Sequence, residues 1–292
     1  MPVISCLDAI LAPGGLTARF EPILEMRPEV TRLHSMEGLV RGPRGTNVES
    51  AVILFEYVRK RLKEPVVDRA CVAAVCRAGR RLPGDIAFSV NVHAVTLARD
   101  RGFVDHLHDT AAHHSIDPHR ITIEIVEHGP AWAGRDLGRA LDAARRLGFA
   151  VALDDVGCGQ SNYRMMIDCD PDYLKIDRYF VAGCHLDRRR CAVLDSVCRL
   201  GQKLGARVVA EGVETYPDLK RAMDVGIDLF QGYLLSPAPA HGEPGRARSL
   251  PAPGEGSRTR RGGLPPIQGD HVPRFFDPLE LLTKVKGMLR DS

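Results

Sequence analysis

The chain has 292 residues, 44% of them hydrophobic, and carries a formal net charge of +3. The excess charge lies after residue 240, where nine Lys and Arg accompany six Asp and Glu, so the first 240 residues are neutral. The neutrality of the first 240 residues argues against binding of a nucleic-acid polymer, which needs a basic patch. A single nucleotide remains a compatible ligand.

The sequence has no apolar run near the ~20 residues that cross a membrane, and its first residues lack the basic start of a signal peptide. None of the eight cysteines forms a Cys-x-x-Cys pair. Most lie in apolar surroundings, which is typical of buried reduced thiols and disfavours a structural zinc site. We therefore expect a cytoplasmic protein without a membrane span.

Strand-like and helix-like segments alternate from about residue 16 to residue 240, after a lead-in helix within residues 1–15. The apolar segments typical of short buried strands are 18–24, 33–40, 86–92, 121–126, 150–153, 173–176, 207–210 and 228–231. The segments with helical period are 47–61, 67–81, 103–114, 135–147, 191–204 and 216–225. This alternation predicts parallel βα units and an α/β fold, a modified (β/α)8 TIM-like barrel. The first two strands lie too close for a helix between them, so we expect one antiparallel strand near the N-terminus.

The composition changes after the barrel region, which we place at residues 16–240. Residues 241–275 are rich in Pro, Gly and Arg and are expected to form a disordered linker. Residues 276–292 have the pattern of a short amphipathic helix, with apolar side chains at Phe276, Leu279, Leu282, Val285 and Leu289. Two interpretations stay open for this helix: docking on the barrel, or binding of a protein partner or a second copy.

Polar residues lie on, or just after, seven of the apolar segments, and they are hard oxygen donors plus one ammonium. In chain order they are Glu37, Asn91, Glu124, Asp154 with Asp155, Lys175, Glu211 and Gln231. The ends of parallel strands meet at one pole of a barrel, where such side chains form an active site. Carboxylate and amide oxygens suit Mg²⁺ or Mn²⁺ and a phosphate ester better than zinc or iron.

The adjacent pair Asp154 and Asp155 suits a two-metal site, in which one carboxylate bridges two cations about 3.5–4 Å apart. Glu124 lies in an apolar segment, where a carboxylate is costly without cations nearby. Lys175 lies between two apolar residues and also needs a partner. It either forms an ion pair with Asp177, on the same strand face, or places its charge next to phosphate or the attacking water.

The sequence blocks that carry these residues resemble the EAL-type cyclic di-GMP phosphodiesterases. The signature tripeptide is Glu37-Gly38-Leu39, followed by Arg41. The other blocks are SVNV (89–92), TIEIVEH (122–128), ALDDVGCGQSN (152–162), YLKIDRYFV (173–181), VVAEGVET (208–215) and QGYLLSPA (231–238). They follow the family's order over about residues 16–240. The resemblance implies hydrolysis of cyclic di-GMP to linear pGpG with two Mg²⁺ or Mn²⁺.

The resemblance also implies roles for single residues. One metal would be held by Glu37, Asn91, Glu124 and Asp154. Asp154 would bridge to the second metal, which Asp155 and Glu211 complete. The residues that would assist catalysis are Lys175, which positions the attacking water, and Glu214 and Gln231, which support the site through hydrogen bonds. Arg41 would face a substrate phosphate, Asp177 is also assigned to the substrate, and Glu127 would anchor the loop after Asp155.

The chain departs from the family pattern at three places. Gly38 replaces the family's alanine, and the loop 156–162 lacks the family's aromatic residues while keeping two glycines. Glu21 replaces a glutamine; its carboxylate could accept hydrogen bonds from the N1–H and N2–H₂ donors of a guanine. The altered loop keeps an alternative function open, a cyclic di-GMP receptor or scaffold with weak or no turnover. A homodimer also stays open.

Overall fold

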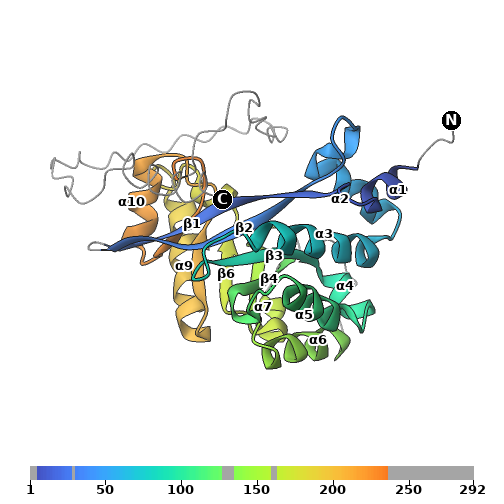
Figure 1. Cartoon of the computed structure of the whole chain (residues 1–292). Helices are drawn as coiled ribbons and strands as arrows, with labels where there is room; N and C mark the ends of the chain where they lie inside the picture. Colours follow the sequence, from blue (N-terminus) through green and yellow to red (C-terminus); the bar gives the residue numbers. More distant parts are fainter. Residues whose placement is uncertain (1–4, 28–29, 127–134, 159–162, 236–292) are drawn as a thin grey trace, which may run out of the picture.

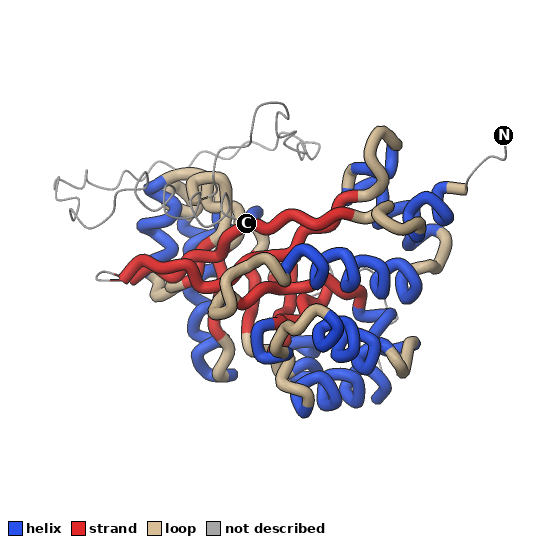
Figure 2. The backbone as a smooth tube through the Cα atoms, viewed as in Figure 1, coloured by secondary structure: helices blue, strands red, loops and turns tan. Residues whose placement is uncertain are grey.

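The computed structural model describes residues 5–27, 30–126, 135–158 and 163–235, and these residues form a closed eight-stranded barrel with its strands in sequence order (Figures 1 and 2). β1 (Thr17–Arg27) pairs antiparallel with both β2 (Val30–Arg41) and β8 (Leu229–Phe230). The other neighbouring strands pair in parallel. The predicted barrel and its antiparallel strand are thus confirmed, and the reversed strand is β1.

The remaining strands lie close to the predicted segments. They are β3 (Ala87–His93), β4 (Ile121–Val126), β5 (Ala150–Val156), β6 (Tyr173–Ile176) and β7 (Arg207–Ala210). The helices are α1 (Cys6–Leu11), α2 (Ala51–Lys60), α3 (Glu64–Gly79), α4 (Ala94–Arg99), α5 (Phe103–His113), α6 (Arg135–Arg146), α7 (Tyr163–Cys169), α8 (Arg178–Val181), α9 (Arg188–Leu204) and α10 (Tyr216–Asp224). The linker 241–275 and the helix expected at 276–292 lie outside the described residues.

Two details of the prediction need correction. The single helix expected at 47–61 is interrupted at Ser50, whose backbone is extended, between a 3₁₀ turn (Asn47–Glu49) and α2. The Ser50 carbonyl accepts the first helical hydrogen bond of α2, a position that serine favours over the helix interior. The helices α4, α7 and α8 were not predicted, because four to seven residues are too few to show a helical period.

The helices cover the outside of the barrel, and the core lies between them and the strands. In β3, the apolar residues Phe88, Val90 and Val92 alternate with the polar residues Ser89 and Asn91, as expected for a strand with one face toward helices and the other toward the barrel interior. This alternation leaves polar side chains on the inner face, where they meet those of the neighbouring strands. Among the described residues, no helix is long and apolar enough to cross a membrane.

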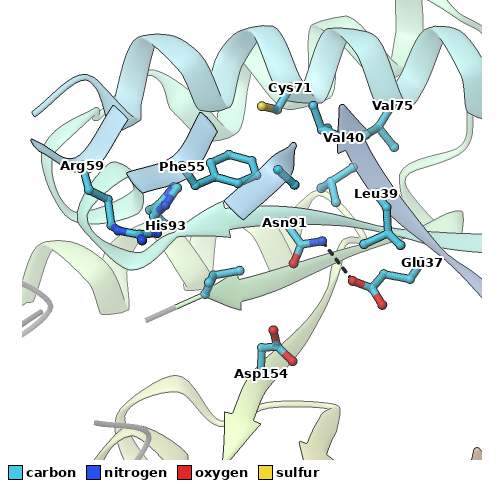
Figure 3. A pocket seen from close by; sticks show the side chains of 13 residues that line it. Glu37, Leu39, Val40, Phe55, Arg59, Cys71, Val75, Asn91, His93 and Asp154 are labelled. Atoms are coloured by element: carbon cyan, nitrogen blue, oxygen red, sulfur yellow. Dashed lines mark hydrogen bonds between the residues drawn. The ribbon is translucent and has the colours of Figure 1, made fainter. Parts of the chain in front are cut away.

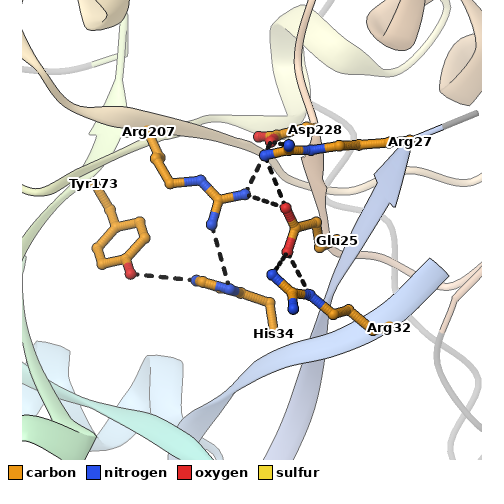
Figure 4. A network of polar contacts seen from close by, with 7 residues as sticks. All are labelled: Glu25, Arg27, Arg32, His34, Tyr173, Arg207 and Asp228. Carbon is orange, nitrogen blue, oxygen red and sulfur yellow. Dashed lines mark hydrogen bonds and ion pairs between the residues drawn. The ribbon is translucent and has the colours of Figure 1, made fainter. Parts of the chain in front are cut away.

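The pole where the parallel strands begin is closed by an ion-pair network (Figure 4). Glu25, 2% exposed, accepts contacts from Arg27 at 2.9 Å, Arg32 at 2.6 Å and Arg207 at 3.1 Å. Asp228 also pairs with Arg27 and Arg207, at 2.6 and 2.9 Å. These contacts join β1, β2 and β7 at the pole opposite the strand ends that carry the predicted site.

Candidate active site

Lys175 lies at the centre of the opposite pole and is almost fully buried, with 2% of its side chain exposed. Its Nζ lies 2.7 Å from Glu211, 3.3 Å from Glu37 and 3.6 Å from Asp154. It also donates to Glu124. Strands β2, β4, β5, β6 and the end of β7 therefore bring one ammonium and four carboxylates together.

Asp177 does not join this cluster as an ion-pair partner of Lys175 within the described residues. Its carboxylate accepts a hydrogen bond of 2.7 Å from the Tyr179 backbone N–H and so caps α8. It also accepts a contact of 3.2 Å from the Cys158 thiol. The charge of Lys175 is therefore directed toward the predicted metal ligands and not toward Asp177.

Two amide side chains fix the carboxylate of Glu37. Nε2 of Gln231 donates to it at 2.6 Å, and Nδ2 of Asn91 donates at 3.2 Å (Figure 3). Burial would raise the pKa of Glu37, but attraction to the Lys175 ammonium and these two hydrogen bonds outweigh burial and lower the pKa. Glu37 is therefore held as an anion with a fixed orientation.

Ser89 is a member of the site that the sequence did not single out. Its Oγ donates a hydrogen bond of 2.8 Å to Glu124, and both residues are buried. Ser89 precedes Asn91 by two residues in β3, so strand alternation places the two side chains on one face. The two-residue spacing from Asn91 was the sequence feature that could have identified Ser89 as a member of the site.

Asp154 and Asp155 both reach the cluster although neighbours on a regular strand point to opposite faces. Asp155 has a left-handed backbone, with φ 51°, and the pairing of β5 with β6 changes register between Leu153 and Val156. One carboxylate oxygen from each of Asp154, Asp155 and Glu211 lies within 4.8 Å of the others. The irregular strand end thus turns two successive carboxylates to one place.

The carboxylates of the site form two groups that share Glu211. The first consists of Glu37, Glu124 and Glu211, and the second of Asp154, Asp155 and Glu211; within each group the oxygens lie within 4.8 Å of one another. The acidic side chains could hold a metal ion in either group. This observation agrees with metal binding.

Crowding of the carboxylates changes their proton affinity. Burial, followed by repulsion from neighbouring carboxylates, raises the pKa of Glu124 and Glu211 well above 4.5, against the attraction of Lys175. Burial and the charge of Asp154 raise the pKa of Asp155 to about 6. Burial would lower the pKa of Lys175, but the surrounding carboxylates raise it well above 10.5. The chain therefore needs further positive charge here to keep all of these carboxylates ionised.

The other predicted residues lie around the cluster. Glu214 pairs with Arg178 at 2.5 Å, so its role through this contact is to hold the segment after β7 against α8. Arg41 is half-buried at the end of β2, and Glu21 lies opposite Glu37 in the β1–β2 register. Glu127 lies outside the described residues.

A pocket of about 200 Å³ opens beside the cluster, between α2, α3 and β3 (Figure 3). Glu37, Asn91 and Asp154 form the side that it shares with the carboxylate site. The far side carries Phe55, Arg59 and His93, and apolar side chains line the space between. A ligand bound at the carboxylates could therefore extend a flat group into this pocket.

Comparison with known proteins identifies the family. Residues 6–238 match the EAL domain, so the chain belongs to the EAL-domain family. It is 31% identical over 165 residues to the oxygen sensor protein DosP of Escherichia coli, covering 56% of this chain and 20% of that protein. It is 32% identical over 154 residues to the cyclic di-GMP phosphodiesterase RocR of Pseudomonas aeruginosa, covering 53% of this chain and 38% of that protein. The chain thus spans well under half the length of these relatives.

Solved structures give the same picture. Klebsiella pneumoniae BlrP1, in complex with manganese and cyclic di-GMP, superposes with a TM-score of 0.69 and 29% identity, over 78% of this chain and 57% of that chain. A standalone EAL protein of Vibrio cholerae with bound cyclic di-GMP superposes with a TM-score of 0.67 and 24% identity, over 75% of this chain and 90% of that chain, which supports the fold.

Proposed function

We propose that this EAL domain hydrolyses cyclic di-GMP to linear pGpG with two Mg²⁺ or Mn²⁺. One observation carries the proposal: four carboxylates pair with the buried Lys175 ammonium, and a fifth, Asp155, lies within 4.8 Å of two of them. When ionised, the cluster has four uncompensated negative charges, which two divalent cations would neutralise. Relatives named cyclic di-GMP phosphodiesterases and the neighbour that binds manganese with cyclic di-GMP support the choice of substrate and metal.

The donor set fits these metals. Hard divalent cations prefer carboxylate and amide oxygens, and the residues present offer only such groups. We assign the first metal to Glu37, Asn91, Glu124 and Asp154, and the second to Asp154, Asp155 and Glu211. Oε1 of Gln231 is buried without a hydrogen-bond donor among the described residues, as expected of an acceptor that faces a hydrated cation.

When bound, the metals would supply the Lewis acidity that makes a nucleophile of water and stabilises charge on the phosphate. The residues of the chain do the rest. In the metal-free chain the surrounding carboxylates raise the pKa of Lys175 well above 10.5, and we assign this ammonium the role of a charge that orients the attacking water. Gln231 and Asn91 hold Glu37 in one orientation, and Arg41 contacts a substrate phosphate.

Cyclic di-GMP hydrolysis is tested directly on the purified full chain. Incubation with cyclic di-GMP and Mg²⁺ or Mn²⁺ should release pGpG, measured by chromatography, and a chelator should stop it. Glu37→Ala and Asp154→Asn should each lower turnover by about 100-fold or more. The matched control is Glu56→Ala, an exposed carboxylate on α2 that pairs with Lys60 and belongs to neither carboxylate group. Binding of cyclic di-GMP with no turnover at micromolar enzyme would contradict the proposal and favour a receptor.

The proposal extends to location and assembly. A nucleotide messenger of bacteria is made and used in the cytoplasm, so we place the protein there. A homodimer, or a partner bound through residues 276–292, is compatible with this function. Size measurement of the full chain and of a chain ending at residue 240 tests both.

A further inference from the structure

A second hollow, of about 550 Å³, lies where β1 begins, β2 ends and α2 begins. Three arginines line it: Arg19 of β1, Arg41 at the end of β2, and Arg44 in the turn that follows. The rest of the lining is mainly small or polar and includes Thr17, Thr46, Asn47 and Ser50. This hollow differs from the pocket beside the carboxylate cluster, and no member of the two carboxylate groups lines it.

None of these three guanidinium groups forms an ion pair with a described residue. Arg19 and Arg44 are exposed and have no polar partner in the described part of the chain. Arg41 is half-buried and donates one long hydrogen bond of 3.4 Å to a neighbouring backbone carbonyl. By contrast, Arg69 pairs with Asp100 at 2.6 Å. Because a guanidinium is always charged and only donates, the hollow offers three cations whose donors remain available to an anion.

The loop that carries Arg44 is held in shape by its own contacts. Glu49 is the carboxylate among the lining residues, and its Oε2 accepts a hydrogen bond of 2.8 Å from the Gly45 N–H. The Gly42 N–H donates to the Glu49 carbonyl at 3.1 Å. A side chain at Gly42 would clash with the Val48 carbonyl oxygen, so the loop packs closely at this residue. A loop that is ordered before binding lowers the entropic cost of holding a ligand.

The charge of the lining indicates the class of ligand. Three positive charges and one negative charge leave a formal charge of +2. A phosphodiester carries one negative charge, whereas a pyrophosphate group carries at least two. We propose that this hollow binds a small molecule through a pyrophosphate group, held chiefly by Arg19 and Arg44. Planar guanidinium groups bind phosphate oxygens through paired hydrogen bonds, and the volume lies within the range of small-molecule sites.

Arg41 connects this hollow to the proposed active site. It follows Glu37 by four residues in β2, so strand alternation places both side chains on one face. Arg41 is also the residue assigned above to a substrate phosphate. A pyrophosphate group held by Arg19 and Arg44 would therefore compete with the substrate for Arg41 and lower the affinity for cyclic di-GMP. This competition rests on the proposed function, whereas the anion site itself does not.

Binding is measured by calorimetry on the full chain in about 0.15 M salt, with EDTA present so that no metal joins pyrophosphate to the carboxylates. The wild type should bind inorganic pyrophosphate. Arg19→Gln and Arg44→Gln should each weaken binding by about fivefold, the effect of losing one charged contact. The matched control is Arg81→Gln, because Arg81 is also exposed and lies outside the lining. Its affinity for pyrophosphate should equal that of the wild type.

Comparison with ADP separates two sources of the same group. Tighter binding of ADP than of pyrophosphate would support the site and identify a nucleoside diphosphate as the ligand. Equal affinities would support the site with free pyrophosphate as the ligand. Three results would overturn the inference: no saturation of the wild type by pyrophosphate below about 1 mM, unchanged affinity in both variants, or an equal loss in Arg81→Gln.

A second titration tests the link through Arg41. Pyrophosphate should weaken binding of cyclic di-GMP to the wild type, and it should have less effect in the double variant Arg19→Gln with Arg44→Gln. An unchanged affinity for cyclic di-GMP while pyrophosphate is bound would overturn the competition. A chain that binds pyrophosphate but neither binds nor hydrolyses cyclic di-GMP would overturn the proposed function and leave the anion site supported.

Discussion

Nζ of Lys175 lies 2.7 Å from Oε1 of Glu211, across the neighbouring strands β6 and β7. Glu211 is also the carboxylate that belongs to both groups of acidic side chains. The same contact therefore links the buried Lys175 ammonium to both groups of carboxylates. Stability, metal binding and activity should respond together when either residue changes.

Replacing Lys175 by methionine should destabilise the metal-free chain and abolish activity. The change removes the one cation that the described residues place among these carboxylates, and removing one partner of a buried ion pair costs about 3–5 kcal/mol. Urea unfolding with EDTA present measures the free energy of unfolding. Lys220→Met, which removes an exposed partner of Asp224, is the control and should cost less than about 1 kcal/mol. Equal unfolding midpoints for the two variants would refute the central role of Lys175.

The stability of the metal-free chain should fall as pH rises through about 6. The pKa of Asp155 is raised to about 6 in the folded state from 3.8, so the folded chain holds a proton that the unfolded chain has lost. A group with a raised pKa stabilises the fold at low pH and loses that contribution as pH rises through its folded value. Melting temperatures from pH 5 to pH 8 measure this, and Asp155→Asn should flatten the profile.

Added Mn²⁺ or Mg²⁺ should reverse this trend, because cations bind ionised carboxylates and compete with protons. The gain in stability should therefore be larger at pH 8 than at pH 5, reaching about 2.7 kcal/mol at a metal concentration 100 times Kd. If the gain in stability on adding metal does not depend on pH, the carboxyl groups with raised pKa are not the ligands of the metal.

At the opposite pole, Glu25→Gln should destabilise the chain by about 2 kcal/mol, below the 3–5 kcal/mol of a fully buried pair, because the side chains of Arg27 and Arg32 are 55% and 66% exposed. Burial would raise the pKa of Glu25, but the hydrogen bond from Arg32 and the charges of Arg207, Arg32 and Arg27 lower it. The stability from Glu25 should therefore be present at neutral pH and be lost as pH falls below about 4.5. In an acid titration, the unfolding free energies of the wild type and of Glu25→Gln should become equal at low pH.

Restoring the family's alanine at position 38 should destabilise the chain, although alanine is typical of the motif. A Cβ on Gly38 would lie 2.6 Å from the Ser89 carbonyl oxygen and 2.6 Å from Cγ1 of Val75. Overpacking of this kind costs about 1–3 kcal/mol. The double change Gly38→Ala with Val75→Ala should recover part of the loss in thermal unfolding. If Gly38→Ala keeps the full stability of the wild type, the Ser89 backbone and the Val75 side chain can move away from the added Cβ without cost.

The sequence by itself determined the barrel, the presence of one antiparallel strand near the N-terminus and most of the residues gathered at one pole. Strand segments such as 121–126, 173–176 and 207–210 match β4, β6 and β7 because short buried strands are read from local apolar runs. The polar residues that end those runs needed no knowledge of contacts, since parallel strands bring their ends to one pole.

Only the tertiary structure decided which groups pair. Lys175 could have met Asp177 by strand alternation, yet it binds four carboxylates from other strands, while Asp177 caps α8. Ser89 joined Glu124, and Asp68 joined His93, across 35 and 25 residues of chain. The periodicity of a sequence shows on which face of its own helix or strand a side chain lies. Such pairings depend on the register and packing of separate segments, which local patterns do not encode.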